Sequence, residues 1–213
     1  MSMQTAAPTA WASVATTRVP SELAARLEAG SHTDTVRAFV LARRTFLAGE
    51  RVDMNVLAAS LGVDRTSLFR WLGNRDALLS EVLWSLAEPT LVRLERASPA
   101  TGSARLTSIL GDFVESLITA PYFQGFLSHE PARALRVLTT KESQVQQRYL
   151  AVVEAMLEAE TGAGRMHYSL STHDLAYLLV RISESFTYAD LITGEKPSAE
   201  RARAAFEYVL RES

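Results

Sequence analysis

Glycine and proline are placed in this sequence so that they separate long stretches of helical periodicity. The 213 residues contain only 10 Gly and 7 Pro, and most of these stand between such stretches. Within the stretches, apolar residues recur three and four positions apart, which is typical of helices that bury one face. No segment shows the alternation of apolar and polar residues that predicts a half-buried strand. The sequence therefore predicts an all-α fold.

The same residues place the helix boundaries. Pro121, Pro131 and Pro197 stand where helices are expected to begin, and Gly194 stands where one is expected to end. Residues 1–17, rich in Ala, Thr and Ser, are predicted to be disordered. Pro89 lies inside a long helical stretch and predicts a kink or break there. The expected helices are 20–29, 34–48, 54–61, 65–72, 74–97, 104–119, 121–128, 131–138, 140–160, 171–193 and 198–211.

The composition restricts the class of protein. Hydrophobic residues make up 47% of the chain and Cys is absent, so a core can be buried without disulfides, and thiolate chemistry is excluded. No apolar run reaches the roughly 18 residues that a membrane span needs. The first 20 residues lack the basic start and the apolar stretch of a signal peptide. We therefore expect a cytoplasmic protein that does not enter membranes.

Residues that could carry catalysis are scattered along the chain. The sequence contains no Gly-rich phosphate loop and no paired-carboxylate motif. The four histidines share no spacing typical of metal ligands (His32, His129, His167 and His173). These observations predict a protein that is not an enzyme and that needs neither a cofactor nor a metal ion.

Charge is distributed unequally between the front and the back of the chain. Between residues 34 and 75, seven Arg stand against four acidic residues, a net charge of +3. From residue 76 onward, thirteen basic and eighteen acidic residues give a net charge of −5. A basic front is expected if only that part meets a polyanion, and ordinary surface variation is the alternative.

Residues 53–72 have the pattern of two short helices joined by a tight turn. Asp53 and Asp64 stand where each helix begins, and a carboxylate at that position accepts bonds from free backbone N–H groups. Gly62 fits the turn because it lacks a Cβ and adopts positive φ without penalty. The apolar residues are spaced to meet inside the corner (Leu57, Leu61, Val63 and Leu68). The pattern predicts a helix-turn-helix, and a helical corner without function is the alternative.

The segment from Asp34 to about Leu83 resembles the DNA-binding domain of the TetR family of repressors. In that family a helix ends in Phe and Gly, and a short helix then carries Leu-Ala or Ile-Ala. Gly-Val-Ser/Asp follows, and the recognition helix ends Tyr-Arg-His-Phe before Gly-Ser-Lys-Glu-x-Leu. The match covers about fifty residues in register, whereas beyond Leu83 the likeness lies in length and helix pattern only. The matching residues are Phe46, Gly49, Leu57, Ala58 and those at 62–64, 66–72 and 73–78.

The resemblance implies a division of the chain and an interface with double-stranded DNA. Residues 1–33 form an extension, 34–80 the helix-turn-helix DNA-binding domain, and 81–213 an effector-binding and dimerisation domain. Phe69 and Trp71 depart from the family's Tyr and His, so a phenolic hydroxyl that often bonds a phosphate is missing. We expect base reading by Arg65, Thr66, Ser67 and Arg70, and backbone contacts by Asn55, Phe69 (through apolar packing), Trp71 and Arg75.

The last two long helices, 171–193 and 198–211, carry apolar stripes. Such stripes most often belong to a core, and the family resemblance is what implies a homodimer built through these helices. Two recognition helices would then lie one DNA turn apart, or a multiple of it, and read a palindromic operator.

The resemblance also implies a small-molecule effector held inside the body. An abundance of aromatic residues favours a hydrophobic compound, with acyl compounds and lactones as examples. Core packing is the alternative for each aromatic residue, and a constitutive regulator without an effector is the alternative for the whole chain. Effector binding would release a repressor by shifting the 74–97 helix. The candidate ligand-binding residues are Trp84, Phe113, Phe123, Phe126, His129, Tyr149, Tyr177, Arg181, Glu184 and Tyr188.

Overall fold

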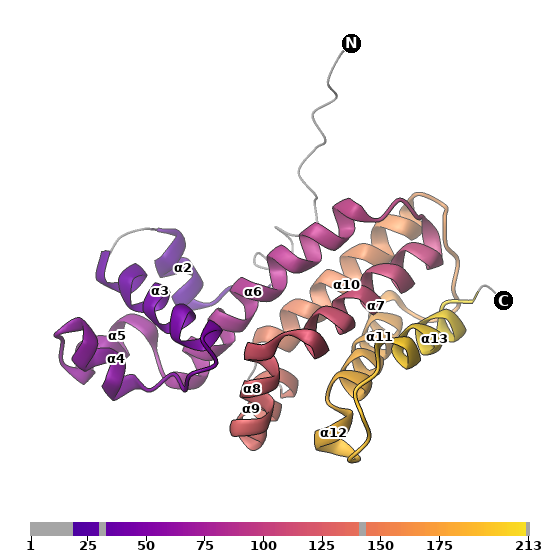
Figure 1. Ribbon diagram of the computed structural model, residues 1–213. Helices are drawn as coiled ribbons and strands as arrows, with labels where there is room; N and C mark the ends of the chain where they lie inside the picture. Colours follow the sequence, from indigo (N-terminus) through magenta and orange to yellow (C-terminus); the bar gives the residue numbers. More distant parts are fainter. Residues whose placement is uncertain (1–18, 30–32, 141–143, 212–213) are drawn as a thin grey trace, which may run out of the picture.

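The computed structural model describes residues 19–29, 33–140 and 144–211. This part of the chain forms twelve helices and no strand, which confirms the predicted all-α class (Figure 1). Helices α2 to α5 gather at one end, and α6 runs from them into a larger helical body. The helices are α2 (Glu22–Glu28), α3 (Thr33–Leu47), α4 (Met54–Leu61), α5 (Arg65–Leu72), α6 (Arg75–Ala97), α7 (Gly102–Thr119), α8 (Pro121–His129), α9 (Pro131–Thr139), α10 (Gln144–Gly162), α11 (Thr172–Thr187), α12 (Ala189–Ile192) and α13 (Ala199–Val209).

The N-terminal module is built around the corner of α4 and α5. Leu57 of α4 and Leu68 of α5 are buried against Phe46 of α3, and they belong to one apolar cluster. Helix α2 packs against α3 and α6, and its Leu23 is buried in the same cluster. The expected helix at 20–29 is therefore present, and it is part of the module rather than a free extension.

Helix α6 continues through Pro89, so the prediction that the helix breaks at this position is wrong. Proline costs about 3 kcal/mol inside a helix because it removes one backbone hydrogen bond and crowds the preceding turn. Trp84 and Leu91, on either side of Pro89, are buried in the body's core. Packing of these flanking turns against α7 and α10 holds the helix together.

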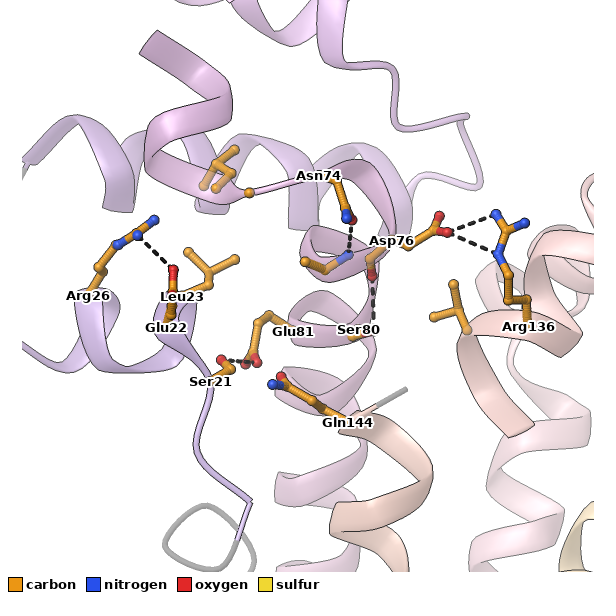
Figure 2. A pocket seen from close by; sticks show the side chains of 14 residues that line it. Ser21, Glu22, Leu23, Arg26, Asn74, Asp76, Ser80, Glu81, Arg136 and Gln144 are labelled. Carbon is orange, nitrogen blue, oxygen red and sulfur yellow. Dashed lines mark hydrogen bonds and ion pairs between the residues drawn. The ribbon is translucent and has the colours of Figure 1, made fainter. Parts of the chain in front are cut away.

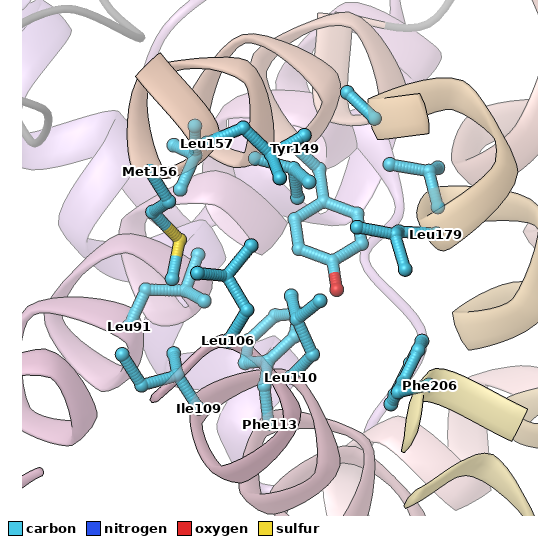
Figure 3. Close-up of a cluster of buried hydrophobic side chains, with 14 of the residues drawn as sticks. Leu91, Leu106, Ile109, Leu110, Phe113, Tyr149, Met156, Leu157, Leu179 and Phe206 are labelled. Carbon is cyan, nitrogen blue, oxygen red and sulfur yellow. The ribbon is translucent and has the colours of Figure 1, made fainter. Parts of the chain in front are cut away.

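The body packs α7, α10, α11 and α13 around a second apolar cluster (Figure 3). Phe113 of α7 and Tyr149 of α10 lie with ring centroids 5.2 Å apart, and Phe206 of α13 is fully buried. Gly111 lets α13 approach α7 closely, because a Cβ on it would lie 2.3 Å from Cγ of Arg203. The interior is filled by interlocking side chains from helices that are far apart in the sequence.

The expectation of one continuous helix over 171–193 is wrong, because this segment forms two helices, α11 and α12. Tyr188 stands between them with φ −109° and ψ 22°, outside the helical range. Its ring is buried and lies 6.2 Å from that of Phe123, so packing with α8 is preferred over continuing the helix. Two further expectations lie outside the described residues: the disorder of residues 1–17, and the first turn, at 141–143, of the helix expected at 140–160.

The helices of the described residues include none with the length and apolar character that crossing a bilayer requires.

Candidate DNA interface and effector cavity

Two aspartates fix the starts of the helix-turn-helix. Asp53 accepts bonds from the backbone N of Asn55 at 2.8 Å and of Val56 at 3.2 Å. Asp64 accepts from the backbone N of Ser67 at 2.9 Å and from its hydroxyl at 2.7 Å. These backbone hydrogen bonds lower the pKa of both carboxyl groups, so both stay ionised at neutral pH. The caps match those predicted from the sequence.

Gly62 ends α4 in the left-handed conformation, at φ 69° and ψ 31°. The next N–H, of Val63, bonds back to the carbonyl of Ala58 at 3.0 Å. This left-handed turn is the reason glycine suits the position, since a Cβ there is strained. The turn sets α5 across α4 and presents one face of α5 to solvent.

The exposed face of α5 holds the side chains expected to read bases. Arg65, Thr66 and Arg70 are exposed, whereas Leu68 and Leu72 on the opposite face are fully buried. Their spacing gives the helix one polar and one apolar side. Two cationic guanidinium groups and a hydroxyl therefore project together from one short helix.

The remaining candidates around α5 are partly engaged. Ser67 uses its hydroxyl proton on Asp64, so it can offer only acceptor lone pairs. Phe69 is half-buried beneath the Arg65 guanidinium, whose Cζ lies 5.2 Å from the ring centroid. Asn55 is exposed at the start of α4, and Trp71 is half-buried at the end of α5. All four lie on the same module as the reading face.

Arg75, which is expected to contact the DNA backbone, has its guanidinium group bound to other groups of the protein. Its two terminal nitrogens donate to the Glu130 carboxylate at 2.6 and 2.5 Å, and its Nε donates to the carbonyl of Val52. The side chain is only 12% exposed, and this bidentate pair lowers the pKa of Glu130. Nothing in the sequence near Arg75 indicated this partner, which is 55 residues away. Arg75 joins the N-terminal module to the α8–α9 junction.

A small cavity of about 60 Å³ lies between α6, α7, α8, α10 and α11. The usual site for a small-molecule ligand has a volume of about 300–1,000 Å³, so this cavity is much smaller than such a site. The lining also includes residues that sequence reasoning missed, such as Thr90, Leu117 and Thr187. Six of the ten candidate ligand-binding residues do line it: Trp84, Phe113, Phe123, Tyr149, Glu184 and Tyr188.

The other four candidates lie outside the lining of this cavity. Phe126 packs edge-on against Phe46, with centroids 5.4 Å apart, and His129 ends the same helix. Tyr177 is 48% exposed, and the guanidinium of Arg181 lies 5.1 Å above its ring. Helical periodicity showed that these residues share helices with cavity residues, but it could not show which face would turn inward.

Two hydrogen-bonded polar groups of the cavity lie on α10 and α11. The hydroxyls of Tyr149 and Ser183 are 2.9 Å apart, and Ser183 donates to the carbonyl of Leu179 at 3.0 Å. Tyr149 is therefore the donor in the bond between the two hydroxyls. Glu184 pairs with Arg181 at 2.9 Å, yet burial still raises the pKa of Glu184 to about 7. The wall formed by α10 and α11 thus contributes hydroxyl groups and a carboxyl group to a mostly apolar space.

Glu184→Gln should change how stability depends on pH. Because the folded protein binds this proton more tightly than the unfolded chain, the free energy of unfolding falls as pH rises from the ordinary value of 4.5 to about 7. The variant lacks this contribution and should gain on the order of 2 kcal/mol relative to the wild type between pH 5 and 8. Urea unfolding of both proteins across this range measures the difference, and parallel pH curves would contradict it.

Among the described residues, no group of three or more acidic or histidine side chains is arranged to hold a metal ion.

A capped helix-turn-helix with an exposed polar face, attached to an all-helical body with a small cavity, is the architecture expected of a regulator of the TetR type. Residues 101–211 match the family model described as "Tetracyclin repressor-like, C-terminal domain". This range is 111 of the 213 residues, more than half of the chain. The chain therefore belongs to the TetR family, whose members are DNA-binding transcriptional regulators.

One solved structure supports the same family, and a second shares the fold. The transcriptional repressor QsdR of R. erythropolis, from the TetR family, is 28% identical, with a TM-score of 0.76. The match covers 85% of this chain and 99% of QsdR. The multidrug binding protein EbrR, crystallised with imidazole, is 19% identical over 86% of this chain and 98% of its own, with a TM-score of 0.53, and this likeness shows the fold alone. Among curated protein sequences, none matches this chain.

Proposed function

We propose that the protein is a sequence-specific transcriptional repressor that is not an enzyme and that reads its operator through α5. The observation that carries the proposal is the exposed face of Arg65, Thr66 and Arg70 on a helix capped by Asp64. Arginine donates two parallel bonds to the major-groove edge of guanine, and a threonine hydroxyl bonds several bases. Ser67 adds an acceptor, while Asn55, Phe69 and Trp71 flank this face and would meet the DNA backbone.

Arg75 is the weakest member of the proposed interface. Its guanidinium already holds Glu130, so a phosphate contact would require it to leave an ion pair. We therefore assign it first to the junction between the module and the body.

Arg65→Ala should weaken binding to the operator by ~1–3 kcal/mol, which is about 5- to 150-fold, and relax specificity at defined base pairs. The physical reason is the loss of donors to a base edge, while the fold stays intact because Arg65 is exposed. The operator is first selected from random duplexes by the wild-type protein, and both proteins are then titrated against it and its single-base variants. Arg37→Ala, which removes an exposed Arg of α3, is the matched control. Unchanged affinity and specificity for Arg65→Ala would contradict the assignment.

The proposed active species is a homodimer formed through α11, α12 and α13. Tyr177 and Leu178 of α11, Ile192 of α12 and Tyr208 of α13 are large apolar side chains exposed on the single chain. A second copy covering these helices would bury them and pair two recognition helices for a palindromic operator. Light scattering at micromolar concentration tests this, since a monomer would count against it.

The proposed effector is a small, mostly apolar molecule that binds in the cavity beside Tyr149 and Glu184. The space of about 60 Å³ is too small for such a molecule, so binding requires the surrounding helices to move apart. A ligand that fits only the opened body favours a conformation different from this one, and that difference is what can release DNA. Regulation without any effector is the alternative function.

A panel of fatty acyl compounds, lactones and aromatic compounds, added to the operator complex, separates these two functions. Release of DNA by one compound class supports the effector. Ser116→Phe places a ring in the cavity wall and should raise the concentration needed for release. If the wild type and Ser116→Phe release DNA at the same effector concentration, the effector binds outside this cavity. If no class of compound releases DNA, the constitutive regulator is favoured.

A further inference from the structure

The helix α2, outside the helix-turn-helix, contacts the end of the recognition helix. Arg26 donates from one terminal nitrogen to the carbonyls of Arg70 at 2.7 Å and of Trp71 at 3.2 Å. Its other terminal nitrogen pairs with Glu22 at 3.0 Å, one turn earlier. The last carbonyls of a helix have no partners within the helix, and the negative end of the helix dipole favours a cation. Arg26 therefore caps α5 from a separate helix.

The start of α2 is bound to the body (Figure 2). Ser21, which also caps α2, donates to the Glu81 carboxylate of α6 at 2.5 Å. Arg148 of α10 pairs with the second oxygen of Glu81 at 3.0 Å and donates from Nε to the carbonyl of Val19 at 3.0 Å. Arg148 is 0% exposed and Glu81 is 6% exposed. The Arg148–Glu81 pair is therefore shielded from water, and together with the part-buried bonds of Ser21 and Val19 it holds the start of α2.

The same arginine lies behind the wall of the effector cavity. Cζ of Arg148 is 5.8 Å from the ring centroid of Trp84, and Trp84 lines the cavity. The next residue on α10, Tyr149, lines it as well. A continuous set of contacts thus runs from the cavity wall through Arg148, along α2, to the end of the recognition helix.

We propose that α2 positions the recognition helix relative to the body and that Arg26 is its positioning residue. This inference rests on the proposed function, because it assigns α2 a part in operator binding and in its control. Besides α6, which is continuous in the chain, and the Arg75–Glu130 pair, α2 then connects the body to the reading helix through side chains. A movement of Trp84 and Arg148 shifts the start of α2 and thereby the support of α5.

A direct phosphate contact by Arg26 is the competing explanation, and salt dependence distinguishes the two. Each lost phosphate contact lowers the slope of log affinity against log salt by about one. Arg26→Ala should bind the selected operator about 10-fold more weakly, with the wild-type slope. A slope lower by about one would assign Arg26 to the DNA backbone and overturn the positioning role. Wild-type affinity would overturn it too.

Hydrogen exchange in the DNA-free protein tests the positioning independently of the operator. Arg26→Ala should speed exchange in the last turn of α5 by about 10-fold and leave α11 at the wild-type rate. Ser21→Ala, which removes side-chain bonds to Glu81 and Ala24 and not to α5, should also speed exchange there by several-fold because it frees the start of α2. Ser171→Ala is the matched control, since Ser171 caps α11 in the same way at 3.0 Å but lies in the body.

Each outcome of the exchange experiment decides the proposal. Faster exchange in α5 with Arg26→Ala and Ser21→Ala, but not with Ser171→Ala, supports it. Wild-type exchange in α5 for Ser21→Ala overturns the connection to the body, even if Arg26→Ala has an effect. If the wild-type protein selects no operator, the proposed function fails, while the exchange result still stands.

Discussion

Arg148→Met should lower the free energy of unfolding by about 3–5 kcal/mol, the cost of breaking a buried ion pair by removing one partner. Arg148 is 0% exposed and its side chain pairs at 3.0 Å with Glu81, whose side chain is 7% exposed. Without the guanidinium, the buried Glu81 carboxylate loses its ion-pair partner and keeps the hydrogen bond from the Ser21 hydroxyl. The methionine fills most of the volume, so the loss reports on charge rather than on a cavity. Urea unfolding at pH 7 measures it.

The double variant Glu81→Gln and Arg148→Met is the control for this prediction. Removing both charges leaves no uncompensated ion, so the double variant should recover most of the lost stability. A loss below about 1 kcal/mol for Arg148→Met alone would show that Glu81 reaches water or another partner. The interpretation of the α2 connection would then have to change as well.

Leu68→Ala should lower the free energy of unfolding by about 2–5 kcal/mol, the usual cost of removing a fully buried leucine side chain. Leu68 is 0% exposed and packs in the cluster that includes Leu57 and Phe46. Since this cluster holds α5 in place, the variant should also lose operator affinity although Leu68 faces away from the reading surface. Thermal and urea unfolding measure the stability, and titration with the selected operator measures the binding.

Val56→Ala is the matched control for Leu68→Ala. Val56 lies in the same corner but is 63% exposed, so the same kind of truncation should change stability by no more than about 0.5 kcal/mol. Equal losses from the two variants would mean that burial in the corner does not decide stability. A stable Leu68→Ala protein with weak operator binding would instead show that packing sets the orientation of α5.

The helix-turn-helix was predictable because its determinants are local. Asp53 and Asp64 bond backbone N–H groups two or three residues away, and Gly62 adopts the conformation that its own lack of a Cβ allows. The exposed and buried sides of α5 follow from a period of 3.6 residues within eight positions. No distant contact is needed to specify any of these features.

The cavity was predictable only in part because its residues come from several helices. An aromatic residue at helical spacing is buried whether it turns toward the cavity, as Phe123 does, or toward Phe46 of α3, as Phe126 does. The break at Tyr188 has the same origin. The sequence near it continues a helical pattern, and the packing of Tyr188 against Phe123 ends the helix.

The order of residues was enough to specify the helical class, most helix boundaries and the capped corner of α4 and α5. All of these depend on neighbours within one or two turns, and so does the face that presents Arg65, Thr66 and Arg70. The tertiary structure decided how distant charges pair. Arg75 holds Glu130, Arg148 holds Glu81, and Arg26 caps the recognition helix. Periodicity cannot specify such pairs, because they depend on which helix faces meet after the core has formed, and the core is selected by packing over the whole chain.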